Sequence, residues 1–331
     1  MKISIYGTGA VGGFIGSQLA LAGLAVSAVD RGPNLEAIQT KGLRLRMDGR
    51  LHTVQLRATA DPEELGPQDL VIVAVKGPFL ADVAGRIGPL LAPDTMVLTA
   101  MNGVPWWFFD GLRGEFEGTR VDAADPGGAI RAGIPTSHVI GCVVYGSFSV
   151  PEPGLVQHTT GRKLIIGEPD GGDSPRVRRL AQLFTGAGLE IVVSSRIQAD
   201  IWYKLWGNMT MNPISAFTGA TSDQILDDPL VNDFCLACMD EAAAIAARIG
   251  CPISESGVER NRITRDMGSF KTSMLQDAAA GRLIEIDTIV GAVREIGRKV
   301  GVPTPHIDIL LGLARLHGGV HGLYPWQPGM D

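Results

Sequence analysis

The chain has 331 residues, of which 45% are hydrophobic and 19% are charged. This balance supports a folded core and excludes a disordered or fibrous protein. The length exceeds that of a typical single domain and favours two domains. The formal net charge of −6 gives no general attraction for nucleic acid or for an anionic membrane surface. We therefore expect neither nucleic acid nor a membrane as a partner.

Targeting and membrane segments are the next feature to consider. The first residues run directly into a strand pattern, without the charged leader and cleavage site of a secretion signal. The longest apolar stretch, from Leu19 to Val29, is shorter than the roughly 20 residues that a membrane-spanning helix needs. We therefore expect a cytoplasmic protein.

Two pairs of side chains have the spacing of metal ligands. Cys235 and Cys238 lie in a segment with apolar residues at helical spacing, which favours core packing over metal binding. His317 and His321 have the spacing of two zinc ligands on a helix, but the two glycines between them disfavour a helix there. We interpret this end of the chain as a mobile tail and expect no bound metal.

The first hundred residues alternate between short apolar runs and segments with helical periodicity. This alternation predicts a parallel sheet with helices on both faces, and a separate hairpin is predicted between Arg44 and Arg57, with its turn at Asp48-Gly49. The predicted strands are Lys2–Tyr6, Ala25–Val29, Leu70–Val75 and Met96–Thr99, and the predicted helices are Val11–Ala22 and Phe79–Leu91.

The character of the chain changes near residue 195. Before it, apolar runs at Val139–Val144, Leu164–Ile166 and Leu189–Val193 predict antiparallel or mixed strands added to the same sheet. After it, nearly every segment has helical periodicity. We predict an α/β domain over residues 1–195 and an all-α domain over residues 196–331. The predicted helices of the second domain are Ile197–Asn212, Asp228–Ile249, Ser254–Met267, Glu285–Val300 and His306–Leu316.

A glycine-rich turn follows the first predicted strand, and a helical pattern starts inside it. In such a turn the first glycine allows the tight bend, the second lets a pyrophosphate approach the backbone, and the third lets the helix pack closely on the strand. The N-terminus of that helix offers N–H groups and a partial positive charge to the phosphates. The turn therefore predicts dinucleotide binding by Gly7, Thr8, Gly9, Ala10, Val11 and Gly12.

Two adjacent residues at the end of the second predicted strand give opposite indications about the cofactor. Asp30 stands where an acidic residue accepts the ribose hydroxyls of NAD, whereas Arg31 is suited to the additional 2′-phosphate of NADP. Adjacent side chains at a strand end point in opposite directions. The residues alone therefore leave both cofactors open.

A row of polar residues crosses an otherwise apolar helical segment. Lys204, Asn208 and Asn212 are four residues apart and lie on one helix face. Buried without partners they would be costly, and a polar ligand would remove that cost. Pro213 follows the row and predicts a kink or an end of the helix. The alternative is that Lys204 extends to solvent while the two asparagines cap a neighbouring loop.

The chemistry of this row is suited to the reduction of a carbonyl group. An amine can protonate the carbonyl oxygen as hydride arrives at its carbon, and amides can hold that oxygen or a carboxylate. Glu285 is a further candidate, although a single glutamate on a helix is usually solvated surface. Ser273 is another, although it is equally suited to capping the helix that follows it.

Five motifs in this order resemble those of the ketopantoate reductases, which make pantoate for pantothenate biosynthesis. The motifs extend over both predicted domains. They are the glycine turn, Val73-Ala74-Val75-Lys76, Met101-Asn102-Gly103, the segment from Lys204 to Pro213, and Thr272–Asp277 followed by Glu285-Ile286-Asp287.

The resemblance implies a fold, a reaction and roles for individual residues. The fold is a Rossmann-type domain followed by an all-α domain like the C-terminal domain of 6-phosphogluconate dehydrogenase. The enzyme is an NADP-dependent oxidoreductase acting on a CH–OH group, with Lys204 as general acid and Glu285 holding Lys204 or contacting the substrate hydroxyl. The substrate ligands are Asn102, Asn208, Asn212 and Ser273, and the cofactor ligands besides the glycine turn are Arg31, Lys76 and Asn102.

Arg31 matches the residue that binds the 2′-phosphate in this family, so NADPH is the expected cofactor and NADH the alternative. The expected small-molecule partner is 2-dehydropantoate (ketopantoate). Two departures from the family pattern keep a bulkier 2-oxo acid as an alternative. Where many members have an additional asparagine, this chain has Thr221-Ser222-Asp223, and a longer loop after Gly103 begins with the aromatic segment Trp106–Phe109.

That aromatic segment is either core beneath the loop or the lining of an enlarged acyl pocket. A third functional class is a nonenzymatic NADP-binding sensor, which would have no use for Lys204 or Glu285. Either a monomer or a homodimer is compatible with the sequence.

Overall fold

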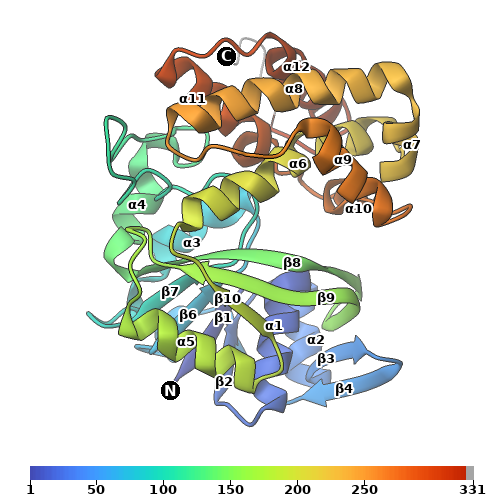
Figure 1. Cartoon of the computed structure of the whole chain (residues 1–331). Coiled ribbons are helices and arrows are strands. Elements are labelled where there is room, and N and C mark those ends of the chain that lie inside the picture. Colours follow the sequence, from blue (N-terminus) through green and yellow to red (C-terminus); the bar gives the residue numbers. More distant parts are fainter. Residues whose placement is uncertain (326–331) are drawn as a thin grey trace. The chain divides into compact units, whose positions relative to one another are not determined.

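The computed structural model describes residues 1–325 and divides into two compact units (Figure 1). The first unit comprises Met1–Met101, Trp106–Arg120 and Gly127–Asp200. The second comprises Asn102–Pro105, Val121–Pro126 and the chain from Ile201 onward. The change of unit therefore follows Asp200, and two short segments that the sequence placed in the first domain belong with the second unit.

The described part of the first unit contains a 10-stranded sheet with the order β4-β3-β9-β8-β7-β6-β1-β2-β5, and β10 pairs with β9. Strands β8 and β9 are the long green arrows of Figure 1. The strands are β1 (Ile3–Tyr6), β2 (Val26–Val29), β3 (Leu43–Met47), β4 (Arg50–Val54), β5 (Arg57–Thr59), β6 (Leu70–Val73), β7 (Met96–Thr99), β8 (Val139–Glu152), β9 (Leu155–Gly167) and β10 (Glu190–Val193).

The sheet is mixed, as the sequence predicted. Strand β1 pairs in parallel with β2 on one side and with β6 on the other. The predicted hairpin is present as the antiparallel pair β3 and β4. The later apolar runs form β8 and β9, which are antiparallel to each other, and β10, which is parallel to β9. The fold class predicted from the sequence is therefore confirmed for this unit.

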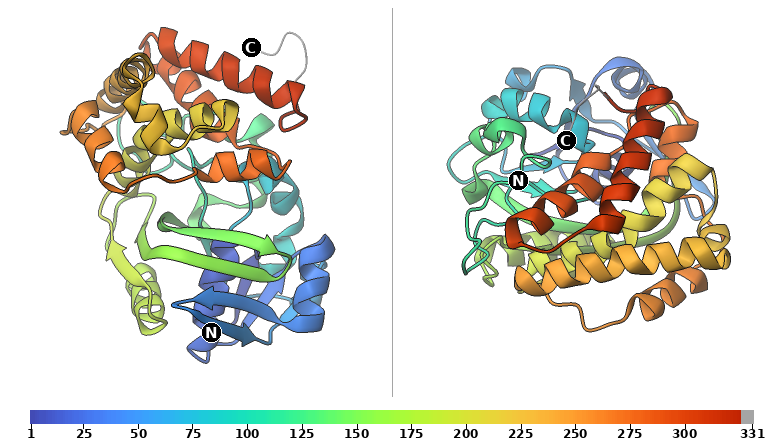
Figure 2. Two further views of the ribbon diagram at one scale, coloured as in Figure 1. Left: turned by 90° about the vertical axis from the view of Figure 1, so that its right-hand side faces the viewer. Right: turned by 90° about the horizontal axis from the view of Figure 1, so that it is seen from above.

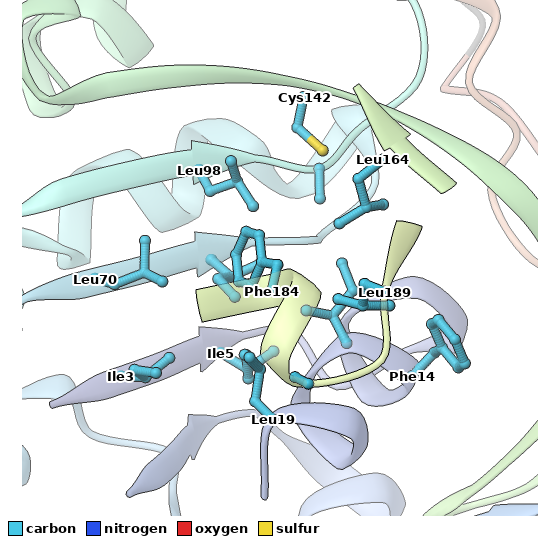
Figure 3. Packing of buried hydrophobic residues seen from close by; sticks show 14 of the residues in the cluster. Ile3, Ile5, Phe14, Leu19, Leu70, Leu98, Cys142, Leu164, Phe184 and Leu189 are labelled. Atoms are coloured by element: carbon cyan, nitrogen blue, oxygen red, sulfur yellow. The ribbon is translucent and has the colours of Figure 1, made fainter. Parts of the chain in front are cut away.

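The central strands are apolar without alternation because both of their faces are covered. Every residue of β1, β6 and β7 is buried, which is the pattern of a parallel sheet packed between helices. One hydrophobic cluster joins strands to helices, and Figure 3 shows Ile5, Leu98 and Phe184 among its buried side chains. Phe184 lies on a helix that begins at Pro175 and is capped by the hydroxyl of Ser174, which accepts from the Val177 N–H.

In the first unit, one predicted helix is shorter than expected, and three helices, α2, α4 and α5, were not predicted. The predicted helix Phe79–Leu91 is shorter, because Pro78 and Pro89 each lie in a 3₁₀ turn beside α3 and a proline removes a helical N–H. An unpredicted helix, α2, follows β2. The helices are α1 (Ala10–Leu21), α2 (Gly32–Lys41), α3 (Leu80–Arg86), α4 (Ala129–Gly133) and α5 (Pro175–Gly186).

The aromatic segment after Gly103 is core. Trp106, Trp107, Phe108 and Phe109 are 2%, 0%, 0% and 1% exposed. The Trp106 indole N–H donates to the Ile134 carbonyl at 3.1 Å, so its polar atom is also satisfied. Side chains buried to this extent present no surface to a ligand, and the structure therefore decides in favour of core over the lining of an acyl pocket.

The second unit is helical, as predicted, and α8 contacts α7, α9, α11 and α12 (Figure 2). Helix α6 crosses from the first unit into the second, because its first four residues belong to the first unit. The helices are α6 (Ile197–Thr218), α7 (Ser222–Asp227), α8 (Pro229–Arg248), α9 (Gly257–Asp266), α10 (Ser273–Ala279), α11 (Ala292–Val300) and α12 (Pro305–Val320).

Three local features of this unit differ from the prediction. Helix α6 continues through Pro213 to Thr218, since a proline removes one N–H donor and a long packed helix tolerates the loss. The predicted helix Glu285–Val300 begins with a π-helical turn at Asp287–Gly291. His317 lies inside α12 rather than in a mobile tail, because Gly318 packs closely against Tyr324.

Among residues 1–325, no helix combines the length and the apolar character that crossing a membrane requires. The same residues contain no group of three or more His, Cys, Asp or Glu side chains placed to hold a metal ion. Cys235 and Cys238 are buried free thiols, and burial raises the pKa of the Cys235 thiol to about 12.

Candidate active site

The glycine turn has the close backbone approach that dinucleotide binding requires. Gly7 has a φ of +91°, and a Cβ there would lie 2.7 Å from a Val75 methyl. A Cβ on Gly12 would lie 2.1 Å from the Gly7 carbonyl oxygen. Helix α1 begins at Ala10 with Gly9 as its N-cap and no acidic residue in its first turn. Its first N–H groups therefore have no side-chain cap and are suited to a phosphate.

The turn lies at the topological switch point of the sheet, where α/β proteins bind their ligands. Gly7 directly follows β1, and the chain after the neighbouring strand β6 runs past it. The Ala74 N–H donates to the Tyr6 carbonyl at 3.0 Å, two residues before Lys76. The Lys76 ammonium nitrogen is buried. Lys76 thus follows by two residues a backbone contact to the strand that leads into the turn.

The carboxylate of Asp30 faces the glycine turn. It accepts from the Thr8 N–H at 2.8 Å and from the Thr8 hydroxyl. It also accepts from the Arg31 N–H at 2.7 Å and from the Asn34 side-chain amide at 2.6 Å. Three of these donors, the two from Thr8 and the one from Asn34, meet the same carboxylate oxygen, and the Arg31 N–H meets the other. Asp30 is therefore bound by groups of the protein itself.

The side chain of Arg31 is differently placed. It is 61% exposed, and its guanidinium lies 4.8 Å from the centroid of the Phe79 ring. A single ion pair joins it to Asp82 at 3.4 Å. Such an exposed pair contributes little to stability, so an incoming phosphate can replace it at low cost.

The Lys204 side chain, which the sequence placed in a polar row, contacts another predicted site residue. Its ammonium donates to the Asn102 side-chain oxygen at 2.8 Å. Asn208 is half-buried and Asn212 is 5% exposed. The Asn212 amide nitrogen has no hydrogen-bond partner among the residues that the structure describes. A buried amide without a partner is costly, and a polar ligand would supply one.

The π turn holds the Asn102 segment in the second unit. The Val104 N–H donates to the Thr288 carbonyl at 2.8 Å. Gly103 has a φ of +82°, and a Cβ there would lie 2.5 Å from the same carbonyl oxygen. The backbone on both sides of this contact is fixed, so a side chain at position 103 would displace Asn102.

Two other predicted residues, Glu285 and Ser273, also belong to the second unit. Glu285 is half-buried and directly precedes the helix that opens with the π turn. Ser273 is exposed and is the first residue of α10. It is not the N-cap, because the Thr272 hydroxyl accepts from the Leu275 N–H at 3.1 Å. The Ser273 hydroxyl is therefore not used as the cap of this helix.

The π turn is itself anchored by the end of the described chain. The Tyr324 hydroxyl donates to the Asp287 carboxylate at 2.8 Å, and the Ile284 N–H donates to the Leu323 carbonyl at 3.0 Å. Burial raises the pKa of the Asp287 carboxyl, while the Tyr324 hydrogen bond and Arg315 oppose that rise. These contacts restrain the backbone on both sides of Glu285.

Sequence reasoning missed two residues that shape the site. Asn34 follows Asp30 by four residues but lies on α2, which the sequence did not predict. Thr288 acts through its backbone carbonyl, which no sequence pattern reveals.

Family models match most of the chain. Residues 3–171 match the model described as ketopantoate reductase PanE/ApbA, and residues 196–317 match its C-terminal counterpart. A curated 2-dehydropantoate 2-reductase from Mesorhizobium japonicum is 46% identical over 98% of this chain and 100% of its own length.

Solved structures agree in fold. A chain from Ralstonia solanacearum MolK2, which bears a provisional ketopantoate reductase name, is 58% identical with a TM-score of 0.94 and covers 98% of this chain and 99% of its own. The structure of D-mandelate dehydrogenase with NADH and anilino(oxo)acetate covers 98% of this chain and 100% of its own, with a TM-score of 0.84. The two sequences are 23% identical, so this likeness shows a shared fold alone. The chain belongs to the ketopantoate reductase family.

Proposed function

We propose that this protein reduces 2-dehydropantoate to (R)-pantoate with NADPH, a step of pantothenate biosynthesis. The observation that carries the proposal is the hydrogen bond from Lys204 to Asn102, in a chain of this family whose curated relative from Mesorhizobium japonicum bears that activity in its name.

Lys204 is the general acid in this proposal. The nicotinamide supplies the hydride that reaches C2 of the oxo acid, and the Lys204 ammonium gives its proton to the carbonyl oxygen, so that the product is an alcohol. The Asn102 side-chain oxygen holds the ammonium at 2.8 Å and directs one of its N–H bonds. Glu285 holds Lys204 or contacts the substrate hydroxyl.

The remaining polar residues bind the substrate. Asn208 and Asn212 continue the face of α6 that carries Lys204, and the unpartnered Asn212 amide nitrogen is a donor for a substrate oxygen. Ser273 binds the substrate carboxylate. Its exposed position, one residue after the Thr272 N-cap, leaves its hydroxyl available for this contact.

The cofactor assignment rests on Asp30 and Arg31. The glycine turn, with Lys76 and Asn102 as further ligands, fits a nicotinamide dinucleotide, and the uncapped N-terminus of α1 fits its pyrophosphate. Asp30 meets four protein donors, whereas Arg31 is exposed beside Phe79. This difference supports NADPH, because the exposed Arg31 guanidinium can donate to an additional phosphate.

The choice of 2-dehydropantoate over a bulkier 2-oxo acid is supported by the burial of Trp106–Phe109. Two residues of the segment Thr221-Ser222-Asp223, which departs from the family pattern, make hydrogen bonds that stabilise the fold. Thr221 caps α7 together with Gln224, and the Ser222 hydroxyl donates to the Gly268 carbonyl at 3.1 Å.

The test is a side-by-side assay of NADPH and NADH oxidation with 2-dehydropantoate and with larger and aromatic 2-oxo acids. We expect the highest kcat/KM with NADPH and 2-dehydropantoate. Turnover of larger acids alone would remove the substrate assignment. No turnover with any 2-oxo acid would remove the enzymatic function.

A further inference from the structure

Asn34 has its side-chain amide fixed at both ends. Its oxygen accepts from the Gly154 N–H at 2.8 Å, in the turn between β8 and β9. Because a backbone N–H only donates, the oxygen must face Gly154, and the NH₂ group must therefore face the opposite way. It faces Asp30, with distances of 2.6 Å to the Asp30 carboxylate and 2.9 Å to the Thr8 hydroxyl oxygen.

This arrangement decides what the Asp30 carboxylate can bind. An acidic residue at the end of the second strand usually accepts the ribose hydroxyls of NAD. Here Asn34 and Thr8 both donate to the same carboxylate oxygen, and the Arg31 N–H donates to the other. The carboxylate is thereby held toward the turn by three donors on one oxygen and one donor on the other.

Resting on the proposed NADPH-dependent function, we propose that Asn34 is a specificity-determining residue that excludes NADH by holding Asp30 against Thr8. NADH is bound more weakly, because the carboxylate that would accept a hydrogen bond from its ribose 2′-hydroxyl is held against Thr8. NADPH binding is favoured, because hydrogen bonds from Thr8, Asn34 and the Arg31 N–H compensate the negative charge of Asp30, which would otherwise repel the 2′-phosphate.

The experiment compares the full-length wild type with Asn34→Ala. The dissociation constants of NADPH and NADH are measured by calorimetry, and kcat/KM is measured with each cofactor. We expect the preference for NADPH to fall by about tenfold, which corresponds to ~1.4 kcal/mol. The preference falls for two reasons. A carboxylate released from Asn34 strengthens NADH binding, and it weakens NADPH binding because it repels the 2′-phosphate.

Gln39→Ala is the matched control. Gln39 lies on the same helix, α2, and its amide donates to the Ala58 carbonyl at 2.9 Å without contacting Asp30. Its removal deletes a comparable hydrogen bond and should leave the preference within twofold of the wild type. A fall in both variants would mean that loosening α2 is sufficient, and the specific role of Asn34 would be refuted.

A second variant keeps the inference testable if Asn34→Ala does not fold. In Asp30→Asn the charge is absent, so we expect NADH affinity to stay within twofold of the wild type, because Asp30 does not serve the ribose. A large loss of NADH affinity in Asp30→Asn would show that Asp30 is a ribose ligand and would overturn the inference. In Asp30→Asn/Asn34→Ala, loss of Asn34 should no longer change the preference.

The calorimetry separates this inference from the proposed function, because nucleotide binding requires no oxo acid. A wild type that prefers NADPH together with an unchanged preference in Asn34→Ala refutes the role of Asn34 alone. A wild type that prefers NADH refutes both this role and the NADPH assignment.

Discussion

The Lys204 ammonium donates a hydrogen bond to the Asn102 side-chain oxygen at 2.8 Å, although the two residues lie 102 positions apart in the chain. Asn102 follows the last buried parallel strand, β7, yet it belongs to the helical unit. Asn102 belongs to that unit because the two residues after it contact the Thr288 carbonyl. The Val104 N–H donates to this carbonyl, and Gly103 lies directly against it. Within the helical unit, a backbone contact to the π turn thus fixes the loop that carries Asn102, the hydrogen-bond partner of the proposed acid.

Gly103→Ala should therefore impair catalysis through Asn102. The added methyl group would meet the Thr288 carbonyl and push Asn102 away from Lys204. We expect kcat for 2-dehydropantoate to fall by at least about tenfold, a barrier increase of ~1.4 kcal/mol, and the KM for NADPH to rise, because Asn102 is also a proposed cofactor ligand. In an Asn102→Ala background the same substitution should have no further effect on kcat.

Gly301→Ala is the control for backbone strain. Gly301 has a φ of +74°, close to that of Gly103, but a Cβ there would meet nothing within 4 Å. The Gly301→Ala substitution should therefore lower the melting temperature and leave kcat unchanged. Equal effects of the two substitutions on kcat would contradict the positioning role of Gly103.

Arg31→Ala should weaken NADPH binding and leave NADH binding nearly unchanged. The guanidinium is the proposed 2′-phosphate ligand, and a charge-assisted hydrogen bond of this kind contributes about 1.5–3 kcal/mol. The KM for each cofactor is the measurement. Arg57→Ala is the control, because Arg57 is also an exposed arginine with a single ion pair, to Glu64 at 3.7 Å. An unchanged NADPH preference in Arg31→Ala would remove Arg31 from the cofactor site.

Trp107→Ala should cost stability without changing substrate preference. Trp107 is fully buried, and truncation of a buried tryptophan costs roughly 3–5 kcal/mol. Urea unfolding measures the loss, and Trp107→Phe should show a smaller one. If Trp107→Phe altered the relative kcat/KM of small and large 2-oxo acids, the segment would line the substrate site after all.

The histidine pair at the end of α12 predicts a pH dependence of stability. The rings of His317 and His321 lie 4.2 Å apart, and burial, followed by the charge of His321, lowers the pKa of His317 below its ordinary 6.5. Protonation of His317 therefore favours the unfolded chain, so its contribution to stability is complete above the unfolded pKa and is lost as the pH falls below it. Melting temperatures at about pH 8 and pH 5.5 should differ less in His321→Gln than in the wild type. An equal difference would exclude coupling of the two rings.

The sequence predicted the elements whose signal is local. The strands around Ile5 and Leu98 are continuous apolar runs because both sheet faces are covered, and the glycine turn follows directly from the need for close backbone approach. The row from Lys204 to Asn212 was visible because helical spacing places these residues on one face.

Features that depend on backbone contacts between distant segments were not predictable. Helix α2 was missed because Gly32 and Pro33 at its start are typical of a turn. The π turn depends on how Ile284 and Asp287 contact the last described residues. The contacts of the Asp30 carboxylate with Thr8 and Asn34, on which the proposed NADPH preference rests, join separate segments and were not predictable either.

The kcat of Lys204→Ala for 2-dehydropantoate, measured with saturating NADPH, tests the central claim most directly. We expect a loss of roughly 10²–10⁴-fold, unchanged NADPH affinity, and partial recovery of kcat when a small primary amine is added to replace the missing acid. A kcat within tenfold of the wild type would contradict the assignment of Lys204 as the proton donor.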